Sequence, residues 1–503
     1  MHPSAGHPLN KLPHDSARKA SPVKSGFWTR FAGPVLALWA VAAMALAPVC
    51  RAATYYISPS GSDSSGGMSE ASPLLTFSAA FARMSAGDEL ILLDGTYSSS
   101  AGTGYINWDD GCATCGQPPS GTSLSEMTYV HAKNPGSVTV DGGNRPGLFL
   151  GRSFQKQSFI KIQGITFEGG GGLYNTSDDT IKDCGFHAAS QGGGAVFGVG
   201  TIDGNWGNTD NLIEDSWMWG QERIIAINYR APRNVWRRIV IRGDGCGTPA
   251  CTGSGNPNVG FTVYNSSFTS VQNILVINRI LGGASPYADF ASAQHEPGPN
   301  VDMGAAEFLS SNEWLGCMSL KSEDGGFYFE ADEVGDNNPT IRNAVAWDDG
   351  GANFNLGSHA KGFVLENLTA GVNNAAGDDG IRVAPGESAG VVRNVIVYRP
   401  KRYGVNSAAP PSYADVFGAE SSAYNQTTCS LGCKAINPSL KYVTRIENGS
   451  PLKGKGFGGG DYGANIVKRY GADDARYKDP GYDALSSINL WPWPNEARIK
   501  SEM

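Results

Sequence analysis

The sequence predicts an all-β protein whose strands wind into a solenoid, and three observations lead to this fold class. Glycine accounts for 67 of the 503 residues, while charged residues make up only 17%. No helical pattern of useful length follows residue 85. Short runs of β-branched and aromatic residues instead alternate with loops rich in Gly, Asn, Asp and Ser, and one short motif recurs among these runs.

The composition also excludes several classes of protein. A coiled coil would be richer in charged helix formers, and a polytopic membrane protein would have more than the single long apolar run of this chain. The 11 Trp, 19 Tyr and 20 Phe provide a core that a disordered chain lacks. No basic block follows the first 52 residues, so no nucleic-acid partner is expected. The remaining class is a large soluble β protein, which we expect to be monomeric.

Residues 1–52 are predicted to be a signal peptide. Lys24 and Arg30 precede an uncharged stretch, residues 31–49, and Cys50-Arg51-Ala52 offers small residues at the cleavage positions. We therefore expect secretion or export to a periplasm, without stable membrane insertion once the segment is removed. Two alternatives are an uncleaved anchor, for which the apolar stretch is short, and a lipid-modified Cys50, which the bulky preceding valine disfavours.

The cysteines agree with an oxidising compartment. Three tight pairs lie in loops that contain Gly, Pro or Ser, where short surface disulfides are expected: Cys112 with Cys115, Cys246 with Cys251, and Cys429 with Cys433. A zinc site at the Cys-Ala-Thr-Cys motif is an alternative, although no second ligand pair lies nearby in the sequence. Cys184 and Cys317 lie in apolar segments and are expected to be buried thiols.

The first part of the chain after the signal peptide is predicted to close one end of the solenoid. Residues 54–58 are typical of a strand, residues 75–84 have helical spacing, and residues 87–97 indicate a turn followed by a strand. A short amphipathic helix here would cover apolar residues that otherwise meet water at the end of the coil.

The recurring motif is an aliphatic residue, any residue, Asn or Asp, and then a small or aliphatic residue. Its copies begin at Ile181, Ile213, Val271, Ile341, Leu365 and Val392, with looser copies at Ile162 and Trp236. Later copies recur roughly every two dozen residues, within the range of solenoid repeats. We expect the Asn or Asp to bond backbone amides at a bend and to stack on its equivalent in the next coil. A leucine-rich repeat is the rival solenoid, but its regular Leu frame is absent.

The motif sets the expected domain boundaries. Residues 53–404 are predicted to form the solenoid with its N-terminal cap. The pattern fades after residue 405, and residues 405–503 are predicted to hold the last coils and a C-terminal cap or tail that packs along the solenoid. A separate C-terminal domain is an alternative, although this region is short of core residues.

The opening of the solenoid resembles a known superfamily. The run YYISPSGSDSSGG, a helix and then AGDELILLDGTY are similar to the start of secreted right-handed parallel β-helix proteins of the pectate-lyase-like superfamily, and nearest to family-nine polysaccharide lyases. The resemblance covers roughly residues 54–400. It implies a right-handed single-stranded parallel β-helix with an N-terminal helical cap, and it says less about activity, because lyases, hydrolases and epimerases share this opening.

The densest group of polar residues lies between residues 321 and 382. Because successive coils stack roughly 5 Å apart, acids in equivalent turns can converge and supply the hard oxygen ligands of Ca²⁺. The predicted metal ligands are Glu323, Asp324, Asp348 and Asp349. The alternative is that Asp-Asp-Gly simply favours turns.

The resemblance also implies roles for particular residues. In family-nine lyases a Ser-Asp-Asp-Gly-x-Asp turn supplies calcium ligands, and a Phe-Lys-Leu-Gly turn one coil later supplies the base. Residues 322–327 are similar to the first turn, so Glu323 and Asp324 carry over as ligands, whereas Phe327 cannot replace an acid. Residues 354–357 match the second turn, except that Asn355 stands where the family has its lysine. The candidate catalytic residues are therefore Lys321, Lys361 and Arg382.

A second polar group is rich in arginine and is a candidate substrate-binding site. Guanidinium groups bind carboxylate or sulfate in a bidentate manner. The candidates are Arg223, Arg230, Arg238 and Arg242. The alternative is a solvated strand face on which arginines pair with acids.

Two functions from different classes remain open at this point. The first is an exported lyase that cleaves an anionic polysaccharide by calcium-assisted β-elimination, with hydrolysis by Asp348-Asp349 and Asp378-Asp379 as a variant. The second is a non-catalytic surface or carbohydrate-binding β-helix protein, which the missing lysine favours. The formal net charge of -8 does not by itself attract an acidic polymer, so local Arg, Lys or a bridging cation would be needed.

Overall fold

The computed structural model describes residues 52–503 apart from nine short segments: 109–110, 153–154, 190–193, 201–206, 245–257, 278–287, 295–309, 331–336 and 374–377. The predicted signal peptide, apart from its last residue, and the predicted Cys246–Cys251 disulfide lie outside the described residues. Among the described residues, no helix is long and apolar enough to cross a membrane.

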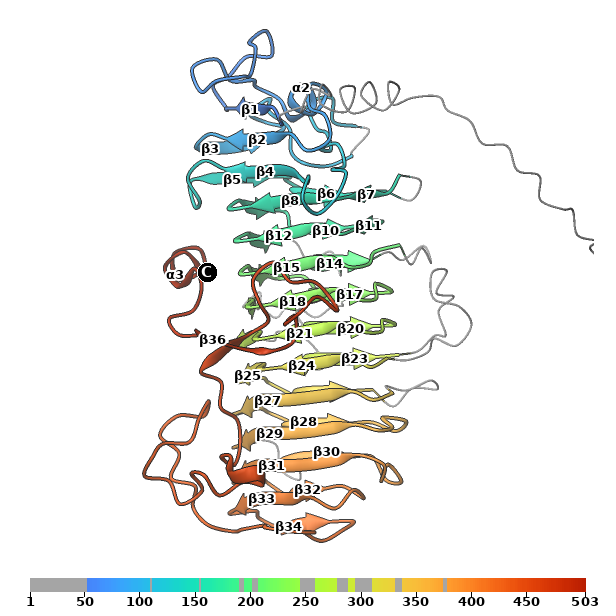
Figure 1. The fold of residues 1–503 in the computed structure, drawn as a ribbon, viewed down its shortest axis with the longest axis vertical. Coiled ribbons are helices and arrows are strands. Elements are labelled where there is room, and N and C mark those ends of the chain that lie inside the picture. The colour runs from blue at the N-terminus through green and yellow to red at the C-terminus, as the bar shows by residue number, and fades with distance from the viewer. Residues whose placement is uncertain are drawn as a thin grey trace, which may run out of the picture. The chain divides into compact units, whose positions relative to one another are not determined.

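The described chain forms a parallel β-helix, which confirms the fold class (Figure 1). Each coil adds strands to two long parallel sheets. Sheet A is 21-stranded and comprises β1 (Thr54–Ile57), β2 (Glu89–Leu92), β3 (Gly95–Ser98), β4 (Thr128–Ala132), β5 (Val138–Asp141), β8 (Ile160–Gln163), β9 (Thr166–Glu168), β12 (Thr180–Lys182), β13 (Gly185–Ala188), β15 (Leu212–Glu214), β16 (Trp217–Gly220), β18 (Val235–Arg237), β19 (Val240–Gly243), β21 (Ser270–Gln272), β22 (Leu275–Ile277), β24 (Glu313–Leu315), β25 (Met318–Leu320), β27 (Thr340–Trp347), β29 (Val364–Gly371), β31 (Val391–Tyr398) and β33 (Ser412–Phe417).

Sheet B is 11-stranded and carries the face on which the candidate site lies. Its strands are β6 (Leu148–Leu150), β10 (Gly171–Leu173), β14 (Ala195–Gly200), β17 (Ile224–Tyr229), β20 (Val259–Tyr264), β23 (Ala288–Ala293), β26 (Gly325–Phe329), β28 (Phe354–Leu356), β30 (Ile381–Val383), β32 (Tyr403–Asn406) and β34 (Ser422–Asn425). Two small sheets complete the strands: β7 (Gln157–Ser158) pairs with β11 (Thr176–Ser177), and β35 (Lys468–Tyr470) pairs with β36 (Leu485–Asn489).

The core consists of residues that stack on their equivalents in the next coil. The rings of Phe290 and Phe327 lie 4.6 Å apart between centroids, and those of Phe327 and Phe354 lie 4.8 Å apart, close to the spacing of neighbouring strands. All three side chains are fully buried. Since successive side chains of a strand point to opposite faces, the residue that follows each of these phenylalanines points outward.

The recurring motif forms the bend between the two halves of sheet A. Its third residue has a positive φ, which Asn and Asp tolerate better than other side chains with a Cβ; the values are 52° at Asp183, 47° at Asn273, 54° at Asn343, 56° at Asn367 and 55° at Asn394. Asn394 Nδ2 donates to Asn367 Oδ1 at 3.0 Å, so the amides also form the predicted ladder. Two coils escaped the sequence pattern because Gly316 (φ 68°) and Tyr413 (φ 50°) occupy this position instead of an Asn or Asp.

The N-terminal cap contains a shorter helix than expected. The structure has α2 at Phe77–Phe81, within the predicted residues 75–84. Thr76 caps it, because its Oγ1 accepts a hydrogen bond from the Ala79 N–H at 3.1 Å. Phe77 and Phe81 are buried, and the Phe77 ring lies 5.5 Å from that of Tyr97, so the apolar face of α2 joins the main core.

The C-terminal segment runs back along sheet A, next to strands that lie far earlier in the sequence (Figure 1). Its backbone bonds to the ladder, where Tyr470 N–H donates to Asn273 Oδ1 at 2.6 Å. Its apolar side chains cover the outside of sheet A; this cluster contains Trp217, Trp219, Val240, Met318, Val345, Ala464, Ile466, Leu490, Trp493 and Ile499. The helix α3 (Glu496–Glu502) ends the segment, and Glu502 accepts a hydrogen bond from the Trp217 indole at 3.0 Å.

The cysteine predictions that fall on described residues are confirmed. Cys112–Cys115 and Cys429–Cys433 are disulfides. Both thiols of the Cys-Ala-Thr-Cys motif are therefore consumed, which excludes the zinc alternative. Cys184 and Cys317 are buried free thiols, and burial raises the pKa of each to about 12.

We expect the conformation of the ladder residues, as well as their hydrogen bonds, to stabilise the fold. Asn394→Gly keeps the positive φ of this position and removes its side-chain bonds, whereas Asn394→Val also places a β-branched residue there. The valine variant should therefore be less stable than the glycine variant by about 1–2 kcal/mol. Thermal unfolding of the two variants, followed by circular dichroism, measures the difference. Equal melting temperatures would contradict the proposed role of the backbone conformation.

Candidate functional site

The candidate site lies on the outer face of sheet B, where one row of outward side chains crosses three coils. Phe327, Phe354 and Ile381 occupy equivalent inward positions. Their neighbours Tyr328, Asn355 and Arg382 are therefore stacked in register on the outside. Arg382 is exposed, and the other two side chains are half-buried. The structure thus brings the predicted catalytic residue Arg382 next to Asn355, the residue at the position of the family lysine.

The turns that precede these strands place acids along one edge of the row. The Gly350 N–H donates to the Ser322 carbonyl at 2.7 Å, so the turns of successive coils stack as predicted. Only glycine fits at residue 350, because a Cβ there would lie 1.8 Å from the Glu323 carbonyl oxygen. By the same register Asp378 lies one coil beyond Gly351. Burial raises the pKa of Asp378, and the nearby charge of Arg382 opposes this shift.

Asp349 lies inside the coil instead of on its surface. Its carboxyl group is fully buried and accepts hydrogen bonds from Asn353 Nδ2 at 2.9 Å and the Ser322 N–H at 3.2 Å. Ser319 Oγ contacts both Asp289, at 2.7 Å, and Asp349, at 3.2 Å.

The contacts of Ser319 indicate the protonation state of Asp349. A hydroxyl group has a single proton, so Ser319 donates to one carboxylate and must accept from the other. Burial, together with the charge of Asp289, holds the pKa of Asp349 well above its usual range. Asp349, predicted as a metal ligand, is therefore a buried carboxyl group that bonds side chains and backbone inside the coil.

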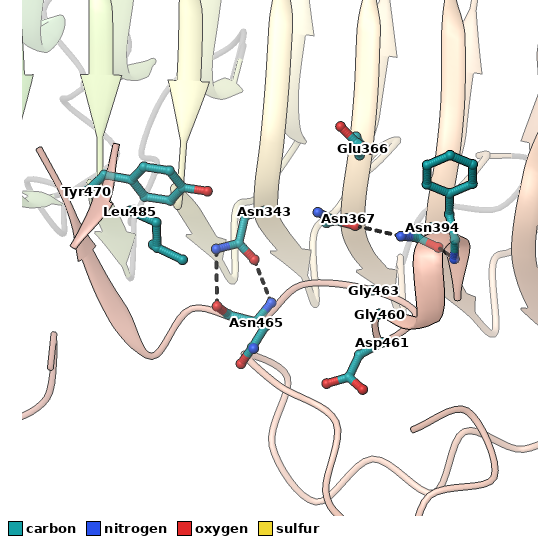
Figure 2. A pocket seen from close by; sticks show the side chains of 11 residues that line it. Asn343, Glu366, Asn367, Asn394, Gly460, Asp461, Gly463, Asn465, Tyr470 and Leu485 are labelled. Atoms are coloured by element: carbon teal, nitrogen blue, oxygen red, sulfur yellow. Dashed lines mark hydrogen bonds between the residues drawn. The ribbon is translucent and has the colours of Figure 1, made fainter. Parts of the chain in front are cut away.

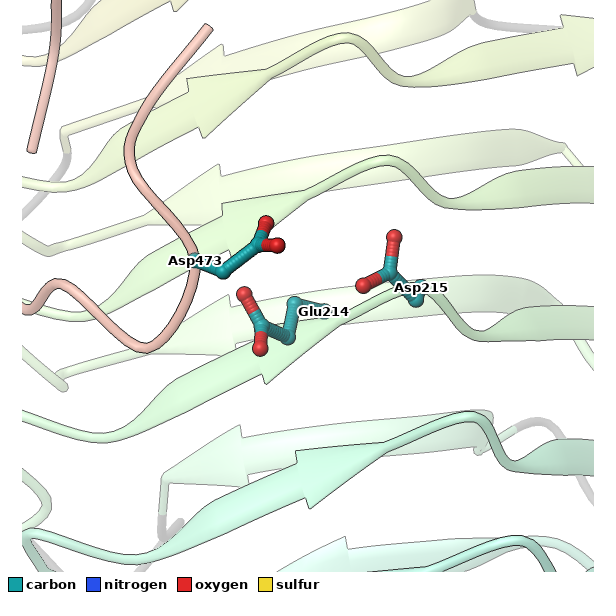
Figure 3. A group of neighbouring side chains, drawn as sticks. All are labelled: Glu214, Asp215 and Asp473. Atoms are coloured by element: carbon teal, nitrogen blue, oxygen red, sulfur yellow. The ribbon is translucent and has the colours of Figure 1, made fainter. Parts of the chain in front are cut away.

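The remaining predicted metal ligands do not converge. Glu323 is exposed, while Asp324 and Asp348 are half-buried. Among the described residues, one trio of carboxylates has ligand oxygens within 4.8 Å of one another, and it consists of Glu214, Asp215 and Asp473 instead (Figure 3). Within the described part of the chain, the predicted quartet does not bring three such oxygens together.

Basic side chains neutralise the negative charge of the three carboxylates drawn in Figure 3. Arg238 donates to Asp215 at 2.5 and 2.9 Å and to Glu214 at 3.0 Å, and it pairs with Asp473 at 2.9 Å. Lys182 pairs with Glu214 at 2.6 Å. Arg238, predicted to bind substrate, is fully buried among these acids and cannot reach a polymer outside the protein. Its charge balances the carboxylates, because a buried charge is stable only when paired.

The other predicted substrate-binding arginines lie on different faces. Arg242 lies on β19 of sheet A, where it donates to Asp244 at 2.6 Å and to the backbone carbonyl of Met503. Arg223 and Arg230 precede and follow β17 of sheet B, and the Arg230 guanidinium lies 5.1 Å from the ring of Tyr229. The structure therefore divides the arginines between the two sheets.

The two predicted catalytic lysines lie at opposite ends of the sheet B strands. Lys321 is exposed in the turn before β26, and Lys361 is exposed in the turn after β28. Arg382 lies between these ends, at the middle of β30. The three candidates are therefore not gathered at one point, and Arg382 is the one that shares the row of Tyr328 and Asn355.

Sequence reasoning missed a set of aromatic side chains on the same outer face. Phe149 lies in the same outward row as Tyr328, six strand-to-strand steps earlier in sheet B. Thr262 and Ala291, in the middle of this row, are buried. Two positions further along the strands, Tyr229 and Tyr264 face the same way, with ring centroids 5.2 Å apart. The available signal was their place directly after an inward residue, but recognising it requires the strand register.

A cavity of about 340 Å³ lies between the ladder and the C-terminal segment (Figure 2). The amide of Asn343 there exchanges two hydrogen bonds with the backbone of Asn465, at 3.1 and 2.5 Å. Glu366 pairs with Arg393 at 2.5 Å, and Asp461 pairs with Lys453 at 2.7 Å. The polar groups of this cavity already bind one another, so it is a seam that holds the segment in place.

Comparison with known proteins gives remote structural matches. No family model matches the chain, and no curated protein matches it. The chain is similar to the crystal structure of pectate lyase Pel9A, with 16% identity and a TM-score of 0.44 over 82% of this chain and 95% of that chain. It is also similar to XylC in complex with xylose (9%, TM-score 0.49, 87% and 97%). A third match is the A-module of the Azotobacter vinelandii mannuronan C-5 epimerase AlgE6 (12%, TM-score 0.47, 70% and 91%).

The raised pKa of Asp349 predicts a pH-dependent stability. The folded protein holds this proton more tightly than the unfolded chain, so the free energy of unfolding falls as the pH rises above about 4. Asp349→Asn removes the titration and keeps the shape, and its amide can donate to Ser319. The variant should gain thermal stability over the parent protein at neutral pH and show a flatter pH profile. Melting temperatures across a pH series test this, and an unchanged slope would count against it.

Proposed function

We propose that the outer face of sheet B binds an anionic polysaccharide and that the protein cleaves this polymer by β-elimination. The observation that carries the proposal is the in-register row of Tyr328, Asn355 and Arg382, with Asp378 along its edge. A parallel β-helix offers an extended surface, and its coil spacing of about 4.8 Å repeats along the direction in which a polymer would lie.

The residues of the row suit the parts of an acidic sugar. A tyrosine ring offers an apolar face and a hydroxyl group, and an amide such as that of Asn355 both donates and accepts hydrogen bonds. The exposed guanidinium of Arg382 can bind a carboxylate through two parallel hydrogen bonds. Arg382 therefore supplies the local positive charge that a protein with a formal net charge of -8 needs for an anionic substrate.

The proposed reaction assigns two roles. Arg382 pairs with the uronate carboxylate and stabilises the negative charge that develops when the proton on the adjacent C5 leaves. Asp378 accepts that proton, and its raised pKa makes it a stronger base than an ordinary aspartate. The C5–H electron pair forms the C4–C5 double bond, the C4–O bond breaks, and the departing oxygen takes a proton from the solvent. Lys321, in the turn two coils earlier, is the alternative base.

Calcium is not part of this proposal. The carboxylates of Glu323, Asp324 and Asp348 do not converge, and Asp349 is buried. No step is therefore assigned to a metal ion.

The proposed site of action is outside the cytoplasm. Two disulfides in the described residues suit an oxidising compartment. We propose that residues 1–52 direct export, so that the mature protein meets polysaccharide outside the cell or in a periplasm.

A non-catalytic carbohydrate-binding protein is the second candidate. Asn355 favours it, because an amide cannot serve as a base at the position where the resembling lyases carry lysine. Both candidates predict binding, and only the first predicts a product with a C4–C5 double bond.

Arg382 is expected to be essential for turnover. Arg382→Ala should lower the rate of unsaturated product formation on polygalacturonate or alginate by about a hundredfold or more, the usual effect of losing a charge-stabilising group. Asp378→Asn should abolish product while binding persists. Ultraviolet absorbance of the unsaturated product measures both. Arg342→Ala, on sheet A, is the control and should retain full activity. Binding of both polymers by the parent protein without any product would favour the second candidate.

Removal of divalent cations is expected to leave activity unchanged. Because Arg382 neutralises the substrate carboxylate in the proposed reaction, dialysis against a chelator should not alter the initial rate. The same absorbance assay, run on chelated protein before and after addition of Ca²⁺, provides the measurement. A rate that disappears with the chelator and returns with Ca²⁺ would show that a metal ion performs this role.

A further inference from the structure

A second hollow lies on the N-terminal part of the coil, far from Arg382. It is a cavity of about 390 Å³, within the size range of small-molecule sites. Its described lining residues are Asn107, Trp108, Cys112, Cys115, Gly116, Gln117, Arg152 and Gln155. The Cys112–Cys115 disulfide forms part of the wall and ties the loop that follows Trp108. The residues of the proposed reaction lie outside this cavity.

Trp108 is the unusual feature of the cavity. Its side chain is 40% exposed, although a large apolar ring normally gains stability from burial. Its ring centroid lies 6.4 Å from that of Phe149, which in turn lies 5.6 Å from that of Tyr174. Three aromatic side chains of successive coils therefore form a continuous platform beside the cavity.

The platform lies on the same face as the proposed reaction site. Phe149 pairs in register with Gly172, then Gly198, and the row continues to Tyr328, Asn355 and Arg382. Gly172 is buried beside the Phe149 ring, and Gly198 is half-buried beside Ile227. Six strand-to-strand steps of about 4.8 Å separate Phe149 from Tyr328, a span of roughly 29 Å. The two places therefore lie along one row of sheet B, in which Thr262 and Ala291 are buried.

The polar groups around Trp108 suit a sugar ring. The Asn107 amide is anchored by donating to the Pro146 carbonyl at 3.2 Å, and Gln117 Oε1 accepts from the Gly151 N–H at 3.0 Å. Arg152 and Gln155 face each other through two backbone hydrogen bonds, at 3.1 and 2.9 Å, which fix the turn that carries their side chains. A ring with an apolar face and a rim of hydroxyl groups matches an aromatic platform edged by amides and a guanidinium.

We infer that the cavity at Trp108 is a distal subsite that holds a sugar residue of the same polysaccharide chain. This inference rests on the proposed binding of a polysaccharide to sheet B. The pyranose ring lies against Trp108, and Gln155 bonds its hydroxyl oxygens. The subsite increases the affinity for long chains and leaves short chains unaffected. Eight strand-to-strand steps separate Phe149 from Arg382, and a short oligosaccharide at Arg382 cannot span these roughly 38 Å.

The test compares a long and a short ligand. Binding of polymeric polygalacturonate and alginate, and of the trisaccharides of each, is measured by calorimetry with the parent protein, Trp108→Ala, Trp108→Phe and Trp491→Ala. Trp491 is a matched control, since it is 41% exposed and belongs to the C-terminal segment. Trp108→Ala should weaken binding of the polymer about tenfold or more and leave trisaccharide binding unchanged. Trp108→Phe should restore most of the loss, and Trp491→Ala should bind as the parent does.

The other outcomes separate the two proposals. If the parent binds both polymer and trisaccharide, and Trp108→Ala binds the polymer equally well, the subsite is wrong while the proposed function stands. An equal loss for polymer and trisaccharide would also overturn it, because it would show a general disturbance of the fold; melting temperatures of all four proteins identify this case. If the parent binds neither polymer, the proposed function fails before the subsite is reached.

Discussion

The hydrogen-bonded register between successive coils is the constraint on which the rest of this structure depends. Each strand pairs in parallel with its equivalent one coil later, so a residue has nearly the same neighbours above and below as its counterparts. The register holds because the chain turns at one fixed point in each coil, where the residue adopts a positive φ; it is Asn, Asp or Gly in most coils, and Arg238 and Tyr413 in two others. A single-residue slip would exchange the inward phenylalanines for the outward row and bury polar groups.

The same stacking explains how the two faces of the molecule came to differ. On sheet A the ladder amides and the outward tryptophans Trp217 and Trp219 offer hydrogen-bonding groups and apolar area, and the C-terminal segment covers both. On sheet B, Tyr328, Asn355 and Arg382 remain at or near the surface. The C-terminal segment therefore covers sheet A and stabilises the fold, and the proposed chemistry is assigned to the outer face of sheet B.

The role of a charged side chain in this protein depends more on where it lies than on its residue type. Arg238 is surrounded by Glu214, Asp215 and Asp473 in the fold and serves to neutralise them. Arg382 projects from the middle of a sheet B strand, where its guanidinium remains exposed. Asp349 and Asp378 differ in the same way, because the first is fully buried against a second carboxyl group and the second is half-buried near Arg382. A polymer outside the protein could therefore contact Arg382 and Asp378, and not the buried Arg238 and Asp349.

The sequence by itself determined the repeating coil, the bend with its Asn ladder, the short disulfides and the stacking of the turns at Ser322 and Gly350, because each depends on local chemistry repeated along the chain. The sequence could not show which side chains face outward. Connections of variable length separate the strands, so the residues that pair between coils cannot be identified from their spacing. Only the tertiary structure buried Arg238 and Asp349, separated Lys321 from Lys361, and aligned Phe149 with Tyr328 and Arg382. These outcomes depend on inter-coil register and on a segment from the far end of the chain, and neither leaves a local pattern in the sequence.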